Sequence, residues 1–250
     1  MPEVVVMWYS PISAFVSAFG PLQAFSRPSL DNSRGYIVKL AVCGFLAFAG
    51  FASAPAAAQN TPPAGSKTIL AFGDSLTAGY GLKNKNDALP GQLQALLSAE
   101  GVPVTVINAG VSGDTTAGGL RRLEWTLKRY NPDYVILALG GNDMLRAINP
   151  QNSQQNLQAM LEILKTHKKP VLLAGMRAPA SMGPAFAKGY DVMYSSLAQQ
   201  YGAVYYPFLL EGVAANPALN LADGVHPNVQ GVAIMARGIY PYVIKMLMKE

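Results

Sequence analysis

The sequence predicts an α/β fold, a three-layer α/β/α sandwich around a five-stranded parallel sheet of flavodoxin-like type. Three observations lead to this prediction. Apolar, β-rich segments alternate with segments of helical pattern from Lys67 to Glu250. The apolar segments are hydrophobic almost throughout, as in strands that are buried on both faces of a sheet. The chain has 250 residues, which suffices for one such domain and leaves little for a second.

The elements follow one another in a regular order, and each is bounded by turn residues. We expect Ser153 to be the N-cap of the third long helix, and Pro227 suits the first position of the last helix. That last helix contains Pro241, where we expect a kink. The expected strands are 67–72, 102–109, 133–141, 170–176 and 203–208, and the expected helices are 89–101, 116–132, 152–169, 186–202 and 228–249.

The N-terminal part of the chain has the three regions of a secretory signal between residues 35 and 60. Arg34 and Lys39 supply positive charge, residues 40–52 are apolar, and small residues allow cleavage after Ala58. An uncleaved anchor is the alternative, but the apolar part is shorter than the ~20 residues of a membrane span. Cys43 is too near the start of the apolar region to favour a lipoprotein.

This signal sets the expected domain organisation and location. Residues 1–58 form an N-terminal extension plus signal peptide, 59–66 a linker, and 67–250 a single domain. Residues 1–34 precede the signal without a clear pattern, and we hypothesise that translation starts near Val38; an unusually long n-region is the alternative. The mature protein would lie outside the cytoplasm, most simply in the periplasm, and would lack cysteine.

Charge and composition exclude several classes of partner. The net charge is +5, and the densest basic cluster, Lys165 to Pro170, is short and suits the end of a helix. No basic stripe interleaved with aromatic residues is present, so no nucleic-acid partner is expected. The sequence has no Cys/His cluster with zinc spacing, and we expect neither a metal nor an organic cofactor. We expect a monomer.

A serine follows the first strand, where "GDSL" begins a glycine-rich turn at Ser75. A serine nucleophile needs a base, and the chain has only two histidines. His167 lies at the polar end of a helix and is expected to be an exposed surface residue. His226 follows Asp223 by three residues on a loop, so the carboxylate can reach one imidazole nitrogen and leave the other for the serine; a helix cap with a satisfied histidine is the alternative reading.

Two further loops follow strands and offer hydrogen-bond donors. "AGVSGDTT" can present backbone N–H groups, and "GGND" places the Asn142 amide after the third strand. The carboxyl ends of parallel strands meet at one rim, where active sites of such sheets lie. Four segments therefore converge on one rim, each with a group that acyl transfer requires.

These motifs resemble the four blocks of the GDSL, or SGNH, hydrolase family: "GDSL", "SGDT", "GGND" and "DGVHP", in the family's order. Within the family, the chain is similar to the secreted thioesterase I, lysophospholipase and arylesterase group. The resemblance implies that Ser75 is the nucleophile, His226 the general base and Asp223 the residue that orients it. It further implies an oxyanion hole made by the backbone N–H groups of Ser75 and Gly113 and the side chain of Asn142.

The resemblance also implies a carboxylic ester hydrolase that works through an acyl-serine intermediate. Its substrates would be aryl or short-to-medium acyl esters, with thioesters and lysophospholipids as further options and transient contact with membrane lipid left open. Met144, Leu145, Ala147 and Ile148 would form an apolar wall beside the oxyanion site, or else only cover the core. Arg177 could reach the rim.

Other interpretations stay open at this stage. Asp74, Asp114 and Asp143 are interpreted as acceptors that brace their loops rather than as reactive groups. A carbohydrate O-acetyl esterase would use the same machinery, although Trp125 is the only tryptophan after the signal. A non-catalytic binding protein on this scaffold is the non-enzymatic alternative. An ordinary α/β-hydrolase is disfavoured because Thr77 stands where its G-x-S-x-G elbow requires glycine.

Overall fold

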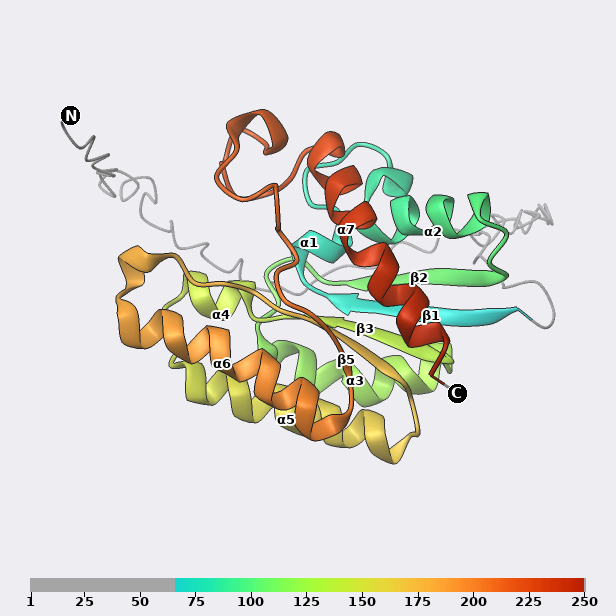
Figure 1. Ribbon diagram of the computed structural model, residues 1–250, viewed down its shortest axis with the longest axis horizontal. Helices are drawn as coiled ribbons and strands as arrows, with labels where there is room; N and C mark the ends of the chain where they lie inside the picture. Colours follow the sequence, from blue (N-terminus) through green and yellow to red (C-terminus); the bar gives the residue numbers. More distant parts are fainter. Residues whose placement is uncertain (1–65, 250) are drawn as a thin grey trace, which may run out of the picture. The chain divides into compact units, whose positions relative to one another are not determined.

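The computed structural model describes residues 66–249, which fold around one parallel β-sheet (Figure 1). The strand order is β2-β1-β3-β4-β5, with all neighbours parallel, which confirms the predicted fold class. The chain leaves β1 toward one edge and returns to β3 on the other side. The strands are β1 Lys67–Gly73, β2 Val104–Gly110, β3 Tyr134–Ala138, β4 Val171–Ala174 and β5 Val204–Tyr206.

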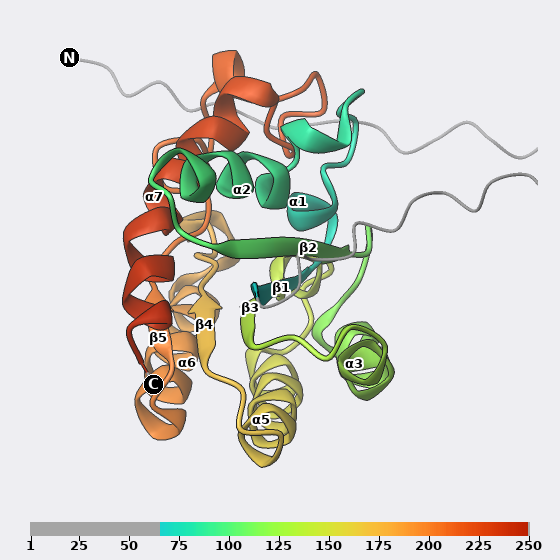
Figure 2. The same cartoon turned by 90° about the vertical axis from the view of Figure 1, so that its right-hand side faces the viewer.

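Helices cover both faces of the sheet, so the molecule has three layers (Figure 2). One layer contains α2 and α7, and the other contains α3, α5 and α6, as right-handed crossovers require for this strand order. The long helices are α2 Leu89–Ala99, α3 Thr116–Tyr130, α5 Pro150–Thr166, α6 Pro184–Tyr201 and α7 Val229–Leu247, and the short ones are α1 Ser75–Ala78, η1 Lys85–Asp87, α4 Gly141–Leu145, η2 Ala180–Met182 and η3 Pro217–Leu219.

Burial differs between the central strands and the edge strands. The residues of β3 and β4 are buried throughout, and only Lys67 of β1 is exposed. The edge strands β2 and β5 are only partly buried, so the expectation of apolar strands covered on both faces holds for the centre of the sheet alone. The central strands therefore form a rigid base for the turns that follow β1 and β3.

Three local predictions need correction or refinement. Ser153 is not an N-cap, because α5 begins earlier, at Pro150, with the Asn149 side chain accepting a hydrogen bond from the backbone N–H of Gln151. Pro227 does not begin α7 either, because Asn228 caps that helix. Pro241 lies inside α7, which continues to Leu247.

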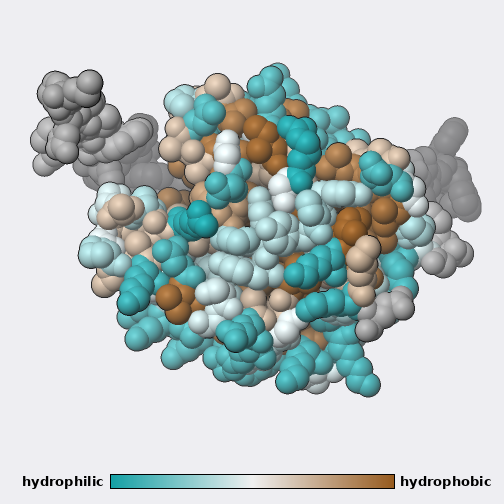
Figure 3. All heavy atoms as spheres, in the orientation of Figure 1, coloured by the Kyte–Doolittle hydropathy of each residue, from teal (hydrophilic) through white to brown (hydrophobic). Residues whose placement is uncertain are grey.

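The surface in the view of Figure 3 is a mosaic in which hydrophobic patches are separated by hydrophilic residues. Among the helices of residues 66–249, none combines the length and the apolar character that a membrane crossing requires. The predicted signal peptide and its cleavage point lie outside the described residues.

Candidate active site

The predicted nucleophile stands at the end of the central strand β1. Asp74 is the N-cap of α1, and Ser75 is the first residue of this one-turn helix. Gly73 is required before it, because a Cβ there would lie only 2.7 Å from the carbonyl oxygen of Ala138 in β3. The turn is thus packed tightly against the neighbouring strand, and Ser75 is 8% exposed.

His226 connects Ser75 with Asp223 through its two ring nitrogens. Its Nε2 lies 2.9 Å from Ser75 Oγ, and its Nδ1 lies 2.7 Å from Asp223 Oδ2. The three side chains come from the end of β1 and from the loop before α7, which are about 150 residues apart in the chain. The structure therefore brings together the serine, histidine and aspartate that the sequence singled out.

Asp223 also shapes the loop that carries the histidine. Its Oδ1 accepts hydrogen bonds from the backbone N–H groups of His226 and Val225, both at 2.9 Å. The backbone N–H of His226 is the largest cause that lowers the pKa of Asp223, to about 2, with Val225 and the imidazole adding to it. The carboxyl group is thus charged at neutral pH, as a partner of an imidazole N–H must be.

The loop itself is fixed by backbone hydrogen bonds at its two ends. The N–H of Leu221 donates to the carbonyl of His226 at 2.7 Å, and the N–H of Asn228 donates to the carbonyl of Leu219 at 2.9 Å. The loop nevertheless remains open to solvent, since the side chain of Asp223 is 39% exposed and that of His226 is 20% exposed. His167, by contrast, is an exposed residue at the C-terminal end of α5, as expected.

Asn142 lies in α4, just after the end of β3. Its amide nitrogen donates to the carbonyl of Asp114 at 2.9 Å and approaches Asp74 Oδ2 at 3.4 Å. Both neighbours are acceptors, so they define which end of the amide is the NH₂ group. The longer contact leaves one N–H weakly engaged and available to a substrate oxygen.

Gly113 lies in the loop after β2 and has a φ of 83°, which favours glycine. Its carbonyl accepts a hydrogen bond from Arg146 Nη2 at 3.0 Å. No hydrogen bond within residues 66–249 uses the backbone N–H of Gly113 or of Ser75. Both groups are therefore free to donate to a ligand.

The three other aspartates bind neighbouring segments, in agreement with the bracing role expected from the sequence. Asp143 is 1% exposed and accepts from the backbone N–H of Thr116 at 2.8 Å, from Thr116 Oγ1 at 2.5 Å and from Ser153 Oγ at 3.0 Å. These bonds join α4 to α3 and α5. They fix the turn that carries Asn142.

Asp114 pairs with Arg122, whose Nε lies 2.6 Å from Asp114 Oδ2. The same guanidinium donates to the carbonyls of Gly73 and Ala109, each at 2.9 Å, and so joins the ends of β1 and β2. Sequence reasoning missed Arg122. Its spacing of three or four residues from the buried Gly118, Gly119 and Thr126 could have indicated a partly buried arginine.

Asp74 is a buried carboxyl group, 3% exposed, directly beside Ser75. Its Oδ1 accepts the N–H of Leu76 at 3.0 Å. Burial raises the pKa of Asp74 to about 6, and the hydrogen bond from Leu76 and the nearby His226 only partly oppose this effect. Its charge therefore changes in a pH range where most carboxyl groups are already ionised.

A small, mostly apolar cavity of about 100 Å³ opens beside Ser75. Met144 and Leu145 line it as predicted, whereas Ile148 and Arg177 are not among its lining residues. Arg177 instead lies 3.4 Å from Glu211 on the surface. The lining residues are Asp74, Ser75, Leu76, Gly141, Asn142, Met144, Leu145, Met176, Leu210, Val225 and His226.

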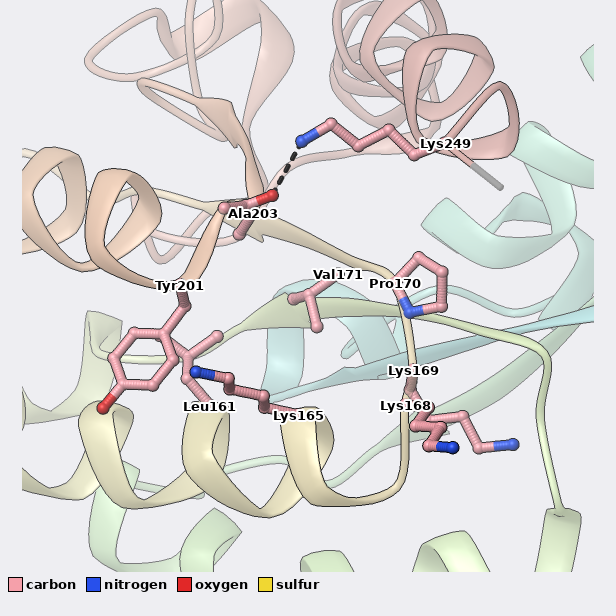
Figure 4. Close-up of a pocket in the computed structure, with 10 residues that line it drawn as sticks. Leu161, Lys165, Lys168, Lys169, Pro170, Val171, Tyr201, Ala203 and Lys249 are labelled. Atoms are coloured by element: carbon pink, nitrogen blue, oxygen red, sulfur yellow. Dashed lines mark hydrogen bonds between the residues drawn. The ribbon is translucent and has the colours of Figure 1, made fainter.

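A second hollow lies at the opposite end of the sheet, where β4 and β5 begin (Figure 4). Four lysines surround it, but the chains of Lys168 and Lys169 point away from that of Lys165, so their ammonium groups do not converge. Lys249 donates to the carbonyl of Gly202 at 2.7 Å. Within residues 66–249, no group of three or more His, Cys, Asp or Glu side chains is placed to hold a metal ion.

Comparison with known proteins is consistent across sequence and structure. The model of the GDSL-like Lipase/Acylhydrolase family matches residues 71–234. Esterase TesA of Pseudomonas aeruginosa is 36% identical over 187 residues, which cover 75% of this chain and 92% of that protein. Thioesterase 1/protease 1/lysophospholipase L1 of Escherichia coli K12 is 34% identical, over 75% of this chain and 84% of that protein.

Solved structures give the same result. The crystal structure of AlinE4, an SGNH-hydrolase family esterase, is 45% identical with a TM-score of 0.61, and the match covers 73% of this chain and 97% of that one.

Proposed function

The chain belongs to the GDSL-like lipase/acylhydrolase family, and we propose that Ser75, His226 and Asp223 are the catalytic triad of this serine ester hydrolase. One observation supports this above all others: His226 lies within hydrogen-bonding distance of Ser75 Oγ and of Asp223 at the same time, at 2.9 and 2.7 Å. A base that is held by a carboxylate and faces a hydroxyl is the arrangement that activates a serine.

In the proposed mechanism, Ser75 Oγ attacks the ester carbonyl carbon while His226 Nε2 takes the hydroxyl proton. The charged Asp223 stabilises the imidazolium that forms. The tetrahedral intermediate then expels the alkoxide, which receives the proton from His226, and the acyl group stays on Ser75. A water molecule, deprotonated by His226, releases the carboxylic acid and restores the hydroxyl of Ser75.

The negative oxygen of the intermediate needs donors that are already in place. We assign this role to the backbone N–H groups of Ser75 and Gly113 and to the amide of Asn142. The first two have no partner within residues 66–249, and the third is held by Asp114 and Asp74. Each such donor typically stabilises the transition state by ~3 kcal/mol.

The size of the cavity indicates which acyl groups suit the site. The cavity is small, with a volume of about 100 Å³, and its walls are mostly apolar. Esters of short acyl chains therefore suit it best, with Met144 and Leu145 as walls. Thioesters and lysophospholipids, the substrate classes that the name of the Escherichia coli relative indicates, are weaker candidates for this chain.

A carbohydrate O-acetyl esterase is the second candidate, because an acetyl group fits the small cavity easily. In both cases one chain suffices, since all three triad residues come from it, and we propose a monomer without cofactor.

We also propose that the chain is exported to the periplasm and cleaved after Ala58. N-terminal sequencing of the exported protein would then begin at Gln59; a start upstream of residue 59 would contradict the cleavage.

Hydrolysis of p-nitrophenyl esters from two to sixteen carbons, by the purified protein and by its Ser75→Ala variant, tests the proposal. We expect activity in the unmutated protein only, with the optimum at short chains. A fluorophosphonate probe should label Ser75 and should not label the variant. Equal activity in the two proteins would exclude Ser75 as nucleophile. Activity on acetylated sugars without activity on p-nitrophenyl acetate would favour the second candidate.

A further inference from the structure

Tyr80 follows the nucleophile helix α1 and is attached to it through the backbone. Its N–H donates to the carbonyl of Ser75 at 3.1 Å, beside the N–H of Gly79, which donates to the same carbonyl at 3.0 Å. Gly79 and Gly81, on either side of Tyr80, have φ values of 80° and 74°, which favour glycine. The backbone turn that carries Ser75 therefore also fixes the position of Tyr80.

The ring of Tyr80 lies against the imidazole of His226. The two ring centroids are 4.4 Å apart, with an angle of 38° between the planes. Tyr80 is 52% exposed and is not among the residues that line the cavity beside Ser75. In the part of the chain that the structure describes, this is the only aromatic contact that His226 makes.

A second contact joins the same two segments. A Cβ at Gly81 would lie 2.5 Å from Leu221 Cδ1, so the turn after α1 packs closely on the histidine loop. Leu221 in turn donates its N–H to the carbonyl of His226 at 2.7 Å. The turn after α1 thus contacts the histidine loop at two places. One is Leu221, which holds the backbone of His226, and the other is the imidazole itself.

We infer that Tyr80 is a positioning residue that keeps the imidazole of His226 directed at Ser75. This inference rests on the proposed triad. The hydrogen bond of Asp223 fixes one edge of the imidazole but does not by itself hold the faces of the ring. The Tyr80 ring covers one face, limits rotation of the imidazole, and places its π-electrons beside the positive charge that forms when Ser75 loses its proton.

The aromatic ring is the part of Tyr80 that this role requires. The backbone contacts with Ser75 and the packing of Gly81 on Leu221 do not depend on the side chain at position 80. A Tyr80→Phe variant therefore keeps the function, and a Tyr80→Leu variant, with an apolar side chain but no ring, loses it. An exposed aromatic residue elsewhere provides the control: Trp125 in α3 is 62% exposed and is absent from the cavity lining.

The test is to measure kcat and KM for a short-chain p-nitrophenyl ester in the unmutated protein and in the Tyr80→Leu, Tyr80→Phe and Trp125→Leu variants. Tyr80→Leu loses this aromatic contact and should lower kcat about 3- to 10-fold, with KM changed less than about twofold. Tyr80→Phe and Trp125→Leu should keep kcat within about twofold. Thermal melting should be nearly the same in all four proteins.

Three results would overturn the inference. In the first, Tyr80→Leu keeps its full kcat. In the second, Tyr80→Phe loses as much as Tyr80→Leu, so that the hydroxyl rather than the ring matters. In the third, the whole loss appears in KM, as for a residue that only binds substrate. If the unmutated protein itself hydrolyses no ester, it is the proposed function that fails.

Discussion

The two halves of the proposed site are held in opposite ways. The half with the buried Ser75 and the partly buried Asn142 lies in the turns after β1 and β3, where Asp143 and the Asp114–Arg122 pair join separate elements. The half with His226 lies on an exposed loop, and Asp223 holds it by bonds to neighbours two and three residues away. The proposed oxyanion donors at Ser75 and Asn142 thus depend on the global fold, whereas the proposed base depends mainly on a local turn.

From this difference we expect some substitutions to affect stability and others to affect only the reaction. On the exposed loop, a side chain can be removed without leaving buried polar groups unpaired. In the buried half, removal of a carboxylate leaves several donors without a partner, and each buried unpaired donor costs free energy. Substitutions in the two halves test this contrast.

The largest effect is expected for His226→Ala, which removes the base from the exposed half. Hydrolysis should fall by about 10⁴-fold or more, because the serine loses its proton acceptor. The melting temperature should change little, since the imidazole is partly exposed and its lost bonds can be replaced by water. His167→Ala, the only other histidine of the chain, is the matched control and should keep normal activity. Activity of His226→Ala near that of this control would refute the assignment.

Asn142→Ala should have the next largest effect on the reaction. Loss of one preorganised oxyanion donor lowers kcat by about 10²- to 10³-fold in comparable enzymes. KM should change little, because the donor binds the transition state more strongly than the ester. A variant that lost affinity for substrate but kept kcat would show that this amide binds the ground state instead.

Asp143→Ala should separate the two halves most clearly, when it is compared with Asp223→Ala. Asp143 accepts three hydrogen bonds in the core, so its removal should lower the free energy of unfolding by about 2–4 kcal/mol. Asp223→Ala should cost much less stability and should mainly lower activity. Denaturant unfolding followed by fluorescence gives both values. Equal losses of stability in the two variants would contradict the contrast between a buried and a locally held half.

The sequence predicted much of the site because three short motifs mark the ends of strands. A parallel sheet brings these ends together, so Ser75, Gly113 and Asn142 could be placed at one rim without coordinates. His226 was selected differently, because the chain has only two histidines and Asp223 precedes this one by three residues. Met176 and Leu210 of the cavity could not be found in this way. They lie in segments without a motif, after β4 and β5, and only packing brings them beside Ser75.

The errors at helix ends have a local cause. Asn149-Pro150 is a strong start signal, with an N-cap followed by proline at the first position, and it should have outweighed Ser153. Ser153 instead donates to the buried carboxylate of Asp143, a contact between elements that no local pattern encodes. The sequence therefore predicted that the three aspartates accept hydrogen bonds that brace their loops, but it could not identify the donors.

The smallest effect concerns the charge of Asp74. Because burial raises its pKa from 3.8 to about 6, folding favours the neutral form. The contribution of Asp74 to the free energy of unfolding should therefore be greatest below about pH 4, decrease as the pH rises from about 4 to about 6, and then level off. At 1.36 kcal/mol per pH unit, this contribution amounts to at most about 3 kcal/mol.

Asp74→Asn cannot ionise, yet its side-chain oxygen can still accept the N–H of Leu76. Urea unfolding at pH 4, 5, 6 and 7 should thus give a smaller loss of stability across this range for Asp74→Asn than for the unmutated protein. Parallel curves for the two proteins would mean that Asp74 is already ionised at low pH. Burial would then not raise the pKa of this carboxyl group, and the two halves of the site would not differ in this respect.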